Sequence, residues 1–237
     1  MIGTIINGVC IVLGGIIGVV AANWVGRRAQ VYIKLALAMA TLYVATEMIF
    51  KGLGGGFLRC LGQLGIAMLS LVLGNAIGMG LGIQKQLNKL GQYAKEKMSK
   101  SGSVDNRFNE GFITCSILFC VGPMSIIGAI EDGLTGNFKI LAIKGAMDGV
   151  ATIGFTAMFG WGSAVSVIPV VAYQGTIAIC AGALEPVLTE TMLDSVRVTG
   201  GLLVFCIVVV ILEIRKVPLA NYLPALVVAP LLTRWWI

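Results

Sequence analysis

Charged residues and histidine are scarce in this chain, and the two shortages exclude different classes of protein. Only 12% of the 237 residues are charged and none is histidine, whereas 57% are hydrophobic. Soluble domains carry about a quarter charged residues, so this chain has too few polar side chains to cover a surface exposed to water. The absence of histidine removes the commonest metal ligand and the usual near-neutral proton carrier. The composition therefore predicts a membrane protein.

Catalytic and metal-binding motifs are also missing. The sequence contains no Walker A loop, no HExxH segment and no zinc-like cysteine spacing. The six cysteines lie mostly in apolar runs, where we expect packing residues and not a disulfide framework. No group of side chains suggests a nucleophile, a base and oxyanion donors together. We therefore expect no enzyme, no cofactor and no metal centre.

The apolar residues are grouped into stretches of membrane-spanning length. A hydrocarbon core needs about 20 mostly apolar residues per helix. Eight stretches qualify: 2–25, 31–50, 61–83, 111–130, 139–160, 163–182, 197–214 and 217–236. The last is the weakest, because Pro218, Pro224 and Pro230 interrupt it. The sequence predicts an all-α, polytopic transmembrane helical bundle of about eight spans, some of them broken by proline.

The long polar segment "QKQLNKLGQYAKEKMSKSGSVDNR" divides the chain. Apolar residues recur near its start at helical spacing, at Ile83, Leu87, Leu90, Ala94 and Met98. With lysines between them, they indicate an amphipathic helix able to lie on an anionic leaflet, or else a solvated linker helix. We predict an N-terminal three-span bundle at 1–84, a cytoplasmic helix and linker at 85–110, and a C-terminal bundle at 111–237.

Basic residues outnumber acidic ones, 17 to 11, and their placement predicts an orientation. With the N-terminus outside, most lysines and arginines fall in the inner loops, as the positive-inside rule requires. Both termini are therefore predicted to lie outside, although one miscounted span would reverse the last loops. The basic run contains no series of stacking aromatic residues, so we expect no nucleic-acid partner.

Glycines four residues apart recur within the apolar stretches and allow helix backbones to approach closely. The pairs are Gly14/Gly18, Gly74/Gly78, Gly78/Gly82 and Gly145/Gly149. We expect them to pack helices within the bundle, and they are also compatible with a homodimer. The related segments "VLGGIIG" (12–18) and "VLGNAIG" (72–78) are compatible with an internal repeat but do not establish one.

Two opposite charges stand one helical turn apart in "LAIKGAMDGVATIGF", residues 141–155. Lys144 and Asp148 share a face of the expected helix, and Thr152 and Thr156 continue the same stripe. A single charge at the centre of a bilayer costs roughly 2.5–3.5 kcal/mol on insertion scales, so the stripe should face the bundle interior or a water-filled cavity. Asp148 is the candidate coupling charge. Lys144 would hold it ionised or act as an internal cation, unless the two form a fixed ion pair that only sets helix register.

Proline breaks flank this charged span on both sides. Gly122-Pro123 interrupts the fourth span, and Pro169 lies within the sixth, in "SAVSVIPVVAYQG". Interrupted spans are the best sequence indication of a transporter site near the membrane midplane. The polar residues beside the breaks, Ser125 and Gln174, are therefore candidate ligands.

Three further polar residues are candidates for which a structural role is an alternative. Asn7 lies within an apolar span and would line the same cavity or bond across helices. Glu131 and Asp132, at the outer end of the fourth span, would gather cations at a mouth or form a solvated helix terminus.

Several segments resemble a family of bacterial integral membrane proteins of unknown function, the YqgA/YdfK type. They are "FCVGPMSIIGAIEDGL", "AIKGAMDG", "YQG", "INGVCIVLGGIIG" and "NYLPALVVAP", and they extend over essentially the whole chain. The resemblance implies a location in the bacterial inner membrane and matching positions for Lys144 and Asp148, but it supplies no substrate.

These observations favour a small secondary transporter with a midplane site between the fourth, fifth and sixth spans. The expected partners are the lipid bilayer and a small ion or metabolite. A cation is slightly favoured, because carboxylates outnumber lysines around the proposed path, although Lys144 could attract an anion. A passive channel and a non-transporting membrane scaffold are the alternatives.

Overall fold

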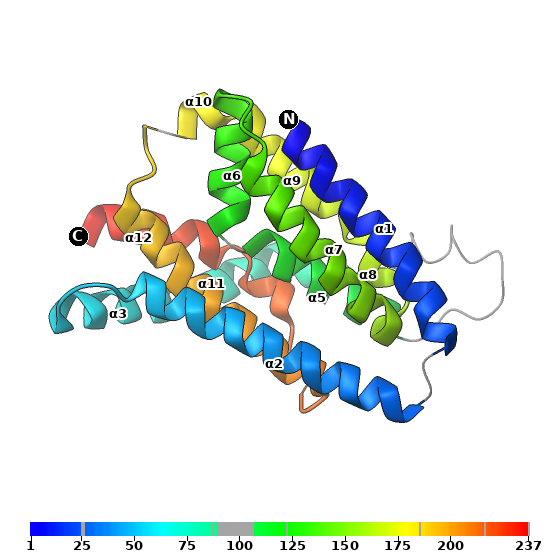
Figure 1. Ribbon diagram of the computed structural model, residues 1–237. Coiled ribbons are helices and arrows are strands. Elements are labelled where there is room, and N and C mark those ends of the chain that lie inside the picture. The colour runs from blue at the N-terminus through cyan, green and yellow to red at the C-terminus, as the bar shows by residue number, and fades with distance from the viewer. Residues whose placement is uncertain are drawn as a thin grey trace. The chain divides into compact units, whose positions relative to one another are not determined.

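The computed structural model describes residues 1–24, 27–86, 88–89, 107–121, 123–184, 186–215 and 217–236, which contain helices and no strand (Figure 1). The α-helices are α1 (Ile2–Trp24), α2 (Arg27–Gly52), α3 (Phe57–Leu81), α5 (Phe108–Val121), α6 (Pro123–Leu134), α7 (Lys139–Phe159), α8 (Gly162–Val165), α9 (Val167–Ile179), α10 (Ala181–Leu184), α11 (Glu190–Ile211) and α12 (Ala225–Trp236), and η1 (Leu219–Tyr222) is a 3-10 helix. The predicted all-α polytopic fold is confirmed.

The number of spans is lower than the sequence predicts. Within the described ranges, six helices are long and apolar enough to cross a membrane, or seven if α5 and α6, bent by 62° at their junction, form one span. The expected span at 217–236 is not among them, because its prolines leave only η1 and the 12-residue α12. A helix of 12 residues is about 18 Å long, well short of a hydrocarbon core of about 30 Å.

The chain forms two compact units, and each takes segments from both sides of the predicted linker. Unit 1 comprises 1–37, 86–120 and 124–185, and unit 2 comprises 38–85, 121–123 and 186–237. Most of the predicted amphipathic helix at 83–98 and most of the linker at 85–110 lie outside the described residues. The predicted division at 1–84 and 111–237 stays a prediction.

Helices α1 and α7 form the tightest helix pair of unit 1 (Figure 1). They run parallel, since Gly3 contacts Leu141 and Gly18 contacts Ile153 further along both helices. A Cβ atom built on Gly14 would clash with the carbonyl oxygen of Gly149, so the two backbones touch at this level. The predicted glycine faces of both helices therefore pack against each other.

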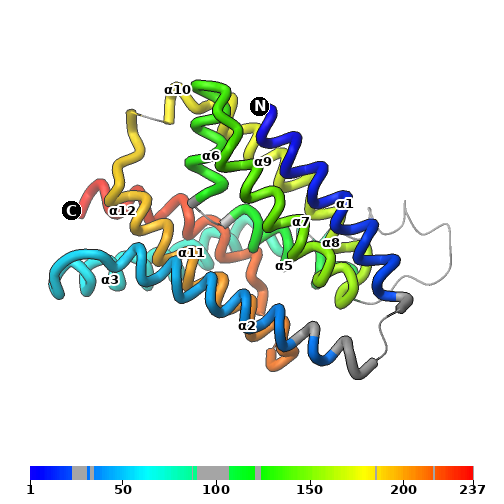
Figure 2. Tube along the Cα trace, viewed as in Figure 1, coloured from blue at the N-terminus to red at the C-terminus, as the bar shows by residue number. Residues whose placement is uncertain are grey.

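Helix α3 of unit 2 uses glycine in a similar way but with an antiparallel partner. Figure 2 traces the chain from α11 into η1 and α12, which lie against α3. A Cβ on Gly74 would clash with Ala225, and one on Gly78 with the carbonyl oxygen of Asn221. The expected packing role of Gly82 is wrong: it ends α3 with a φ of +63° and has no neighbour within 4 Å of a built Cβ.

The two predicted helix breaks differ in extent. α5 ends at Val121 and α6 begins at Pro123, a position where the missing N–H of proline costs nothing. α8 and α9 are divided only at Ser166, whose φ of −58° and ψ of −14° stay helical, and together they are long enough for one span. Pro169 is the third residue of α9 and does not stand at mid-helix as expected.

Candidate functional site

Lys144 and Asp148 form a buried ion pair on α7, inside unit 1. Their residues are only 6% and 8% exposed, so the expectation that the charged stripe faces the interior is met. The ammonium group of Lys144 also lies 5.7 Å from the centre of the Phe119 ring, within the range of a cation–π contact. Burial of a charge costs free energy, and the pairing of Lys144 with Asp148 offsets part of that cost.

The threonine stripe continues this buried face along α7. Thr152 Oγ1 donates to the backbone carbonyl of Asp148 at 2.6 Å. Thr156, one turn further, is buried as well, and its hydroxyl has no hydrogen-bond partner among the described residues. The stripe is therefore a row of polar groups spaced one helical turn apart.

Asn7 of α1 and Gln174 of α9 meet beside the ion pair. Asn7 Nδ2 donates to Gln174 Oε1 at 3.2 Å, and the Asn7 side chain also lies beside the Asp148 carboxylate. The backbones of α1 and α7 are close at Gly145, where a built Cβ would stand only 2.9 Å from the Cα of Asn7. This close approach brings the Asn7 side chain next to the ion pair. Of the predicted ligands, Asn7 and Gln174 thus join the charged pair.

Ser125 lies next to the α5/α6 break, and its hydroxyl proton is engaged in a hydrogen bond. Ser125 Oγ donates to the carbonyl oxygen of Phe119 at 2.7 Å. That carbonyl would bond the N–H of residue 123 in a continuous helix, but proline has no N–H. Ser125 therefore replaces the lost backbone bond, and its oxygen can still accept from a ligand.

The two carboxylates expected at a mouth have different surroundings. Asp132 is buried, and its carboxylate accepts from the Met1 ammonium at 3.0 Å and from the Thr4 backbone N–H at 3.3 Å. It thus caps the first turn of α1, where a negative charge is favourable. Glu131 accepts from Asn137 Nδ2 at 2.9 Å. The mouth stays a prediction for which only Glu131 remains accessible.

Sequence reasoning missed several neighbours of the pair. The thiol of Cys120 on α5 is close enough to interact electrostatically with both charges, and the thiol of Cys115 with Asp148. Tyr173 of α9 lies near Cys120 in turn. These neighbours lie on α5 and α9, and no local pattern in the sequence indicates which helix they contact.

Unit 2 contains a second buried polar network, which the sequence did not indicate. Gln63 Oε1 accepts from Ser195 Oγ at 2.8 Å, and Ser195 also bonds Thr233. Thr233 Oγ1 also lies 2.9 Å from the carbonyl oxygen of Ala229, so its single proton can go either to that carbonyl or to Ser195. The signal was a lone glutamine, Gln63, within an apolar span.

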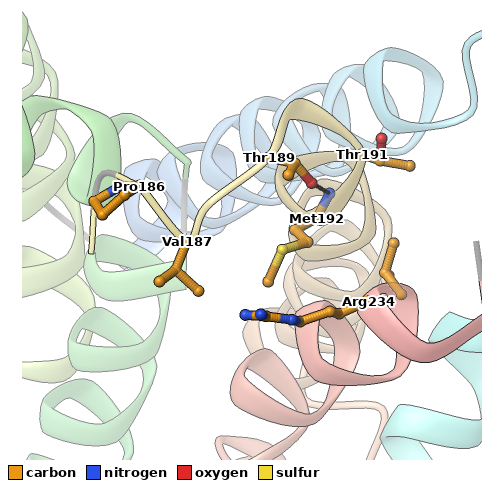
Figure 3. A pocket seen from close by; sticks show the side chains of 7 residues that line it. Pro186, Val187, Thr189, Thr191, Met192 and Arg234 are labelled. Carbon is orange, nitrogen blue, oxygen red and sulfur yellow. Dashed lines mark hydrogen bonds between the residues drawn. The ribbon is translucent and has the colours of Figure 1, made fainter. Parts of the chain in front are cut away.

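A pocket of about 430 Å³ opens beside this network (Figure 3). Its lining is Pro186, Val187, Thr189, Thr191, Met192, Thr233 and Arg234. The Thr189 hydroxyl is occupied in accepting from the Met192 N–H at 3.3 Å, which caps α11. None of the predicted site residues lies in this lining.

Metal-binding groupings were sought across the same residues. In the part of the chain that the structure describes, no three histidine, cysteine, aspartate or glutamate side chains are placed to hold a metal ion. All six cysteines are free thiols. The chemistry on offer at the unit 1 site is therefore that of a carboxylate, an ammonium, two amides and hydroxyls.

Comparison with known proteins identifies relatives of the whole chain. It is 29% identical over 230 residues to the uncharacterized membrane protein YdfK of Bacillus subtilis, covering 97% of this chain and 94% of that one. It is 27% identical over 238 residues to the uncharacterized protein YqgA of Escherichia coli, covering 100% and 97%. No solved structure matches.

These relatives and the apolar helices agree on a multi-pass membrane protein. The model of the family described as Protein of unknown function (DUF554) matches residues 2–234. The chain therefore belongs to the DUF554 family.

Proposed function

We propose that this protein is a small secondary transporter of the bacterial inner membrane, with Asp148 as its coupling group. The observation that carries the proposal is the ion pair of Asp148 with Lys144, buried within unit 1. Ionisable side chains inside a membrane are costly and are characteristic of ion pathways and proton relays. A pair that served only to join helices could be replaced by apolar side chains at little cost.

The surroundings of the pair support a binding site. The two breaks, between α5 and α6 and between α8 and α9, lie on helices of the same unit as α7. Broken helices expose backbone carbonyls and helix ends, which transporters use for ion and substrate contacts. Asn7, Gln174 and Ser125 add amide and hydroxyl groups from α1, α9 and α6.

The two charged residues would have opposite roles. Asp148 would bind the transported cation or a proton, and Lys144 would occupy the carboxylate when neither is bound. The ammonium then acts as an internal counter-ion, so that the carboxylate is never left unpaired in the membrane interior. This exchange favours a cation over an organic anion.

The test is ion flux into liposomes containing the purified protein. With an imposed gradient of Li⁺, Na⁺ or K⁺, and the cation content of the washed liposomes measured directly, we expect the wild-type protein to take up one of these cations and Asp148→Asn to abolish the uptake. Asp194→Asn is the matched control, since Asp194 forms its ion pairs with Arg59 and Arg197, which both belong to unit 2. Wild-type flux in a folded Asp148→Asn variant would remove Asp148 from the mechanism.

A membrane scaffold is the second candidate, favoured by the closed ion pair and by the backbone contact between Gly14 and Gly149. A scaffold would keep its cellular phenotype in Asp148→Asn and lose it in Gly14→Leu. A passive channel, the remaining alternative, would show flux without concentrating any ion against its gradient.

A further inference from the structure

Unit 1 contains several buried polar atoms that have no hydrogen-bond partner among the described residues. Four of them are Thr4 Oγ1, Asn7 Oδ1, Thr156 Oγ1 and Gln174 Nε2. Each belongs to a side chain that is at most 2% exposed. Native proteins leave few such atoms unpaired, and a buried polar site of this kind is where internal water is bound.

These atoms lie in one column with the ion pair. Because α1 and α7 run parallel and Asn7 contacts Gly145, the Thr4 and Asn7 side chains precede Asp148 along the bundle. Thr152 and Thr156 follow it on α7, and Gly18 contacts Thr156. From Lys144 to Thr156 the helix rises by about 18 Å, more than half of a hydrocarbon core of about 30 Å.

We infer that the coupling ion of the proposed transporter is the proton, and that Asp148 exchanges it along this column through bound water. The inference rests on the proposed function, which it deepens by naming the ion. Thr152 and Thr156 would carry the path on one side of Asp148. Asn7, Gln174 and Thr4 would carry it on the other.

The spacing of the column fits water better than a metal ion. Polar side chains one turn apart are separated by a rise of about 6 Å. A water molecule that makes two hydrogen bonds of about 2.8 Å at a roughly tetrahedral angle joins atoms about 4.5 Å apart, so a short chain of two waters bridges that distance. A metal ion instead needs several oxygen ligands converging on one point, whereas here they are spread along the helix.

Each proton transfer exchanges one O–H bond for another. A hydronium ion of the column gives a proton to Asp148 Oδ2 and becomes a water molecule. The neutral carboxyl no longer holds the Lys144 ammonium, so the site carries one net positive charge while the ammonium keeps its contact with the Phe119 ring. Asp148 then releases the proton to a water molecule on its other side, which becomes hydronium, and the neutral ion pair forms again.

Other groups face Asp148 from the helices around it. They are Asn7 on α1, Cys115 and Cys120 on α5, and Lys144 on α7, with Tyr173 of α9 beside Cys120. Lys144 is the only positive charge among these neighbours, and it lies within one turn of Asp148. Protonation of Asp148 is therefore coupled first to the opening of this one ion pair.

The test is proton flux into liposomes containing the full chain, driven by a potassium diffusion potential and followed by an internal pH dye. We expect Thr156→Val, which keeps the shape of the side chain, to slow the flux by about tenfold. Thr156→Ser retains the hydroxyl and should restore most of the flux. The control is Thr176→Val, because Thr176 is exposed and bonds only its own helix at Ala172.

The outcomes separate this inference from the proposed function. Unchanged flux in Thr156→Val, or equal loss in the Val and Ser variants, would overturn the water column. Cation uptake that depends on Asp148 but moves no protons would refute the proton and leave the transporter standing. Wild-type transport in Asp148→Asn would defeat the proposed function itself.

Discussion

Each of the two compact units buries a polar network, and the two networks differ in charge. The network of unit 2 is neutral: Ser195 bonds both Gln63 and Thr233, and nearby backbone carbonyls accept from its members. That of unit 1 contains the charged pair Lys144 and Asp148. Both units leave some buried amide or hydroxyl atoms without partners in the described parts of the chain, such as Asn7 Oδ1 in unit 1 and Thr199 Oγ1 in unit 2.

The difference in charge bears on the role of each network. A neutral hydrogen-bonded network joins helices and specifies one arrangement. A buried charge costs stability, and inside a membrane it is characteristic of ion pathways and proton relays. Under the proposed function, Asp148 of unit 1 carries the transport role and the network of unit 2 assembles helices.

The largest expected effect comes from leaving one charge unpaired. Lys144→Met should lower the free energy of unfolding by about 3–5 kcal/mol, because Asp148 would remain buried without its partner. Removing both charges, in Lys144→Met with Asp148→Leu, should restore much of that loss. Thermal and denaturant unfolding in detergent measure both variants. If the double variant is no more stable than the single one, the loss of stability is due to packing. The charge of the unit 1 network would then not explain how it differs from the network of unit 2.

A smaller effect is expected from the glycine contact that holds α1 against α7. Gly14→Ala places a methyl group against the Gly149 carbonyl and should cost about 1–3 kcal/mol. The control is Gly65→Ala in α3, where a built Cβ meets nothing within 4 Å. That variant should unfold at the wild-type temperature or above it. Equal losses in the two variants would indicate helix propensity and not contact as the cause.

The smallest effect on stability is expected in the neutral network of unit 2. It tests whether this network contributes to ion flux at all. Gln63→Leu removes the acceptor of Ser195 and should cost about 1 kcal/mol. Ion flux per folded molecule should stay at the wild-type level, because no charge is disturbed. Stability is measured by thermal unfolding and flux in liposomes. Loss of flux without loss of fold would show that unit 2 also contributes to transport.

The fold could be predicted from the sequence where one pattern dominates. The length of the apolar stretches predicted most of the spans. The pairs Gly14/Gly18 and Gly145/Gly149 predicted the helix faces that pack closely. The final span was overcounted, because hydropathy measures apolarity while the prolines at 218, 224 and 230 decide how long a helix persists.

The site could be predicted only where partners lie on one helix. Lys144 and Asp148 share a face of α7 by spacing alone, so their pairing followed from periodicity. The meeting of Asn7 with Gln174 and the capping of α1 by Asp132 join residues far apart in the chain. Such contacts depend on tertiary packing, which no local pattern encodes.

The backbone contact between Gly14 and Gly149 restricts how unit 1 can move. Where helix backbones touch along glycine faces, sliding or rotation brings atoms into clash. We therefore expect α1 and α7 to move together as one rigid body. Under the proposed function, the rocking that alternately opens the Asp148 carboxylate to the two sides of the membrane would fall to the breaks at the start of α6 and between α8 and α9.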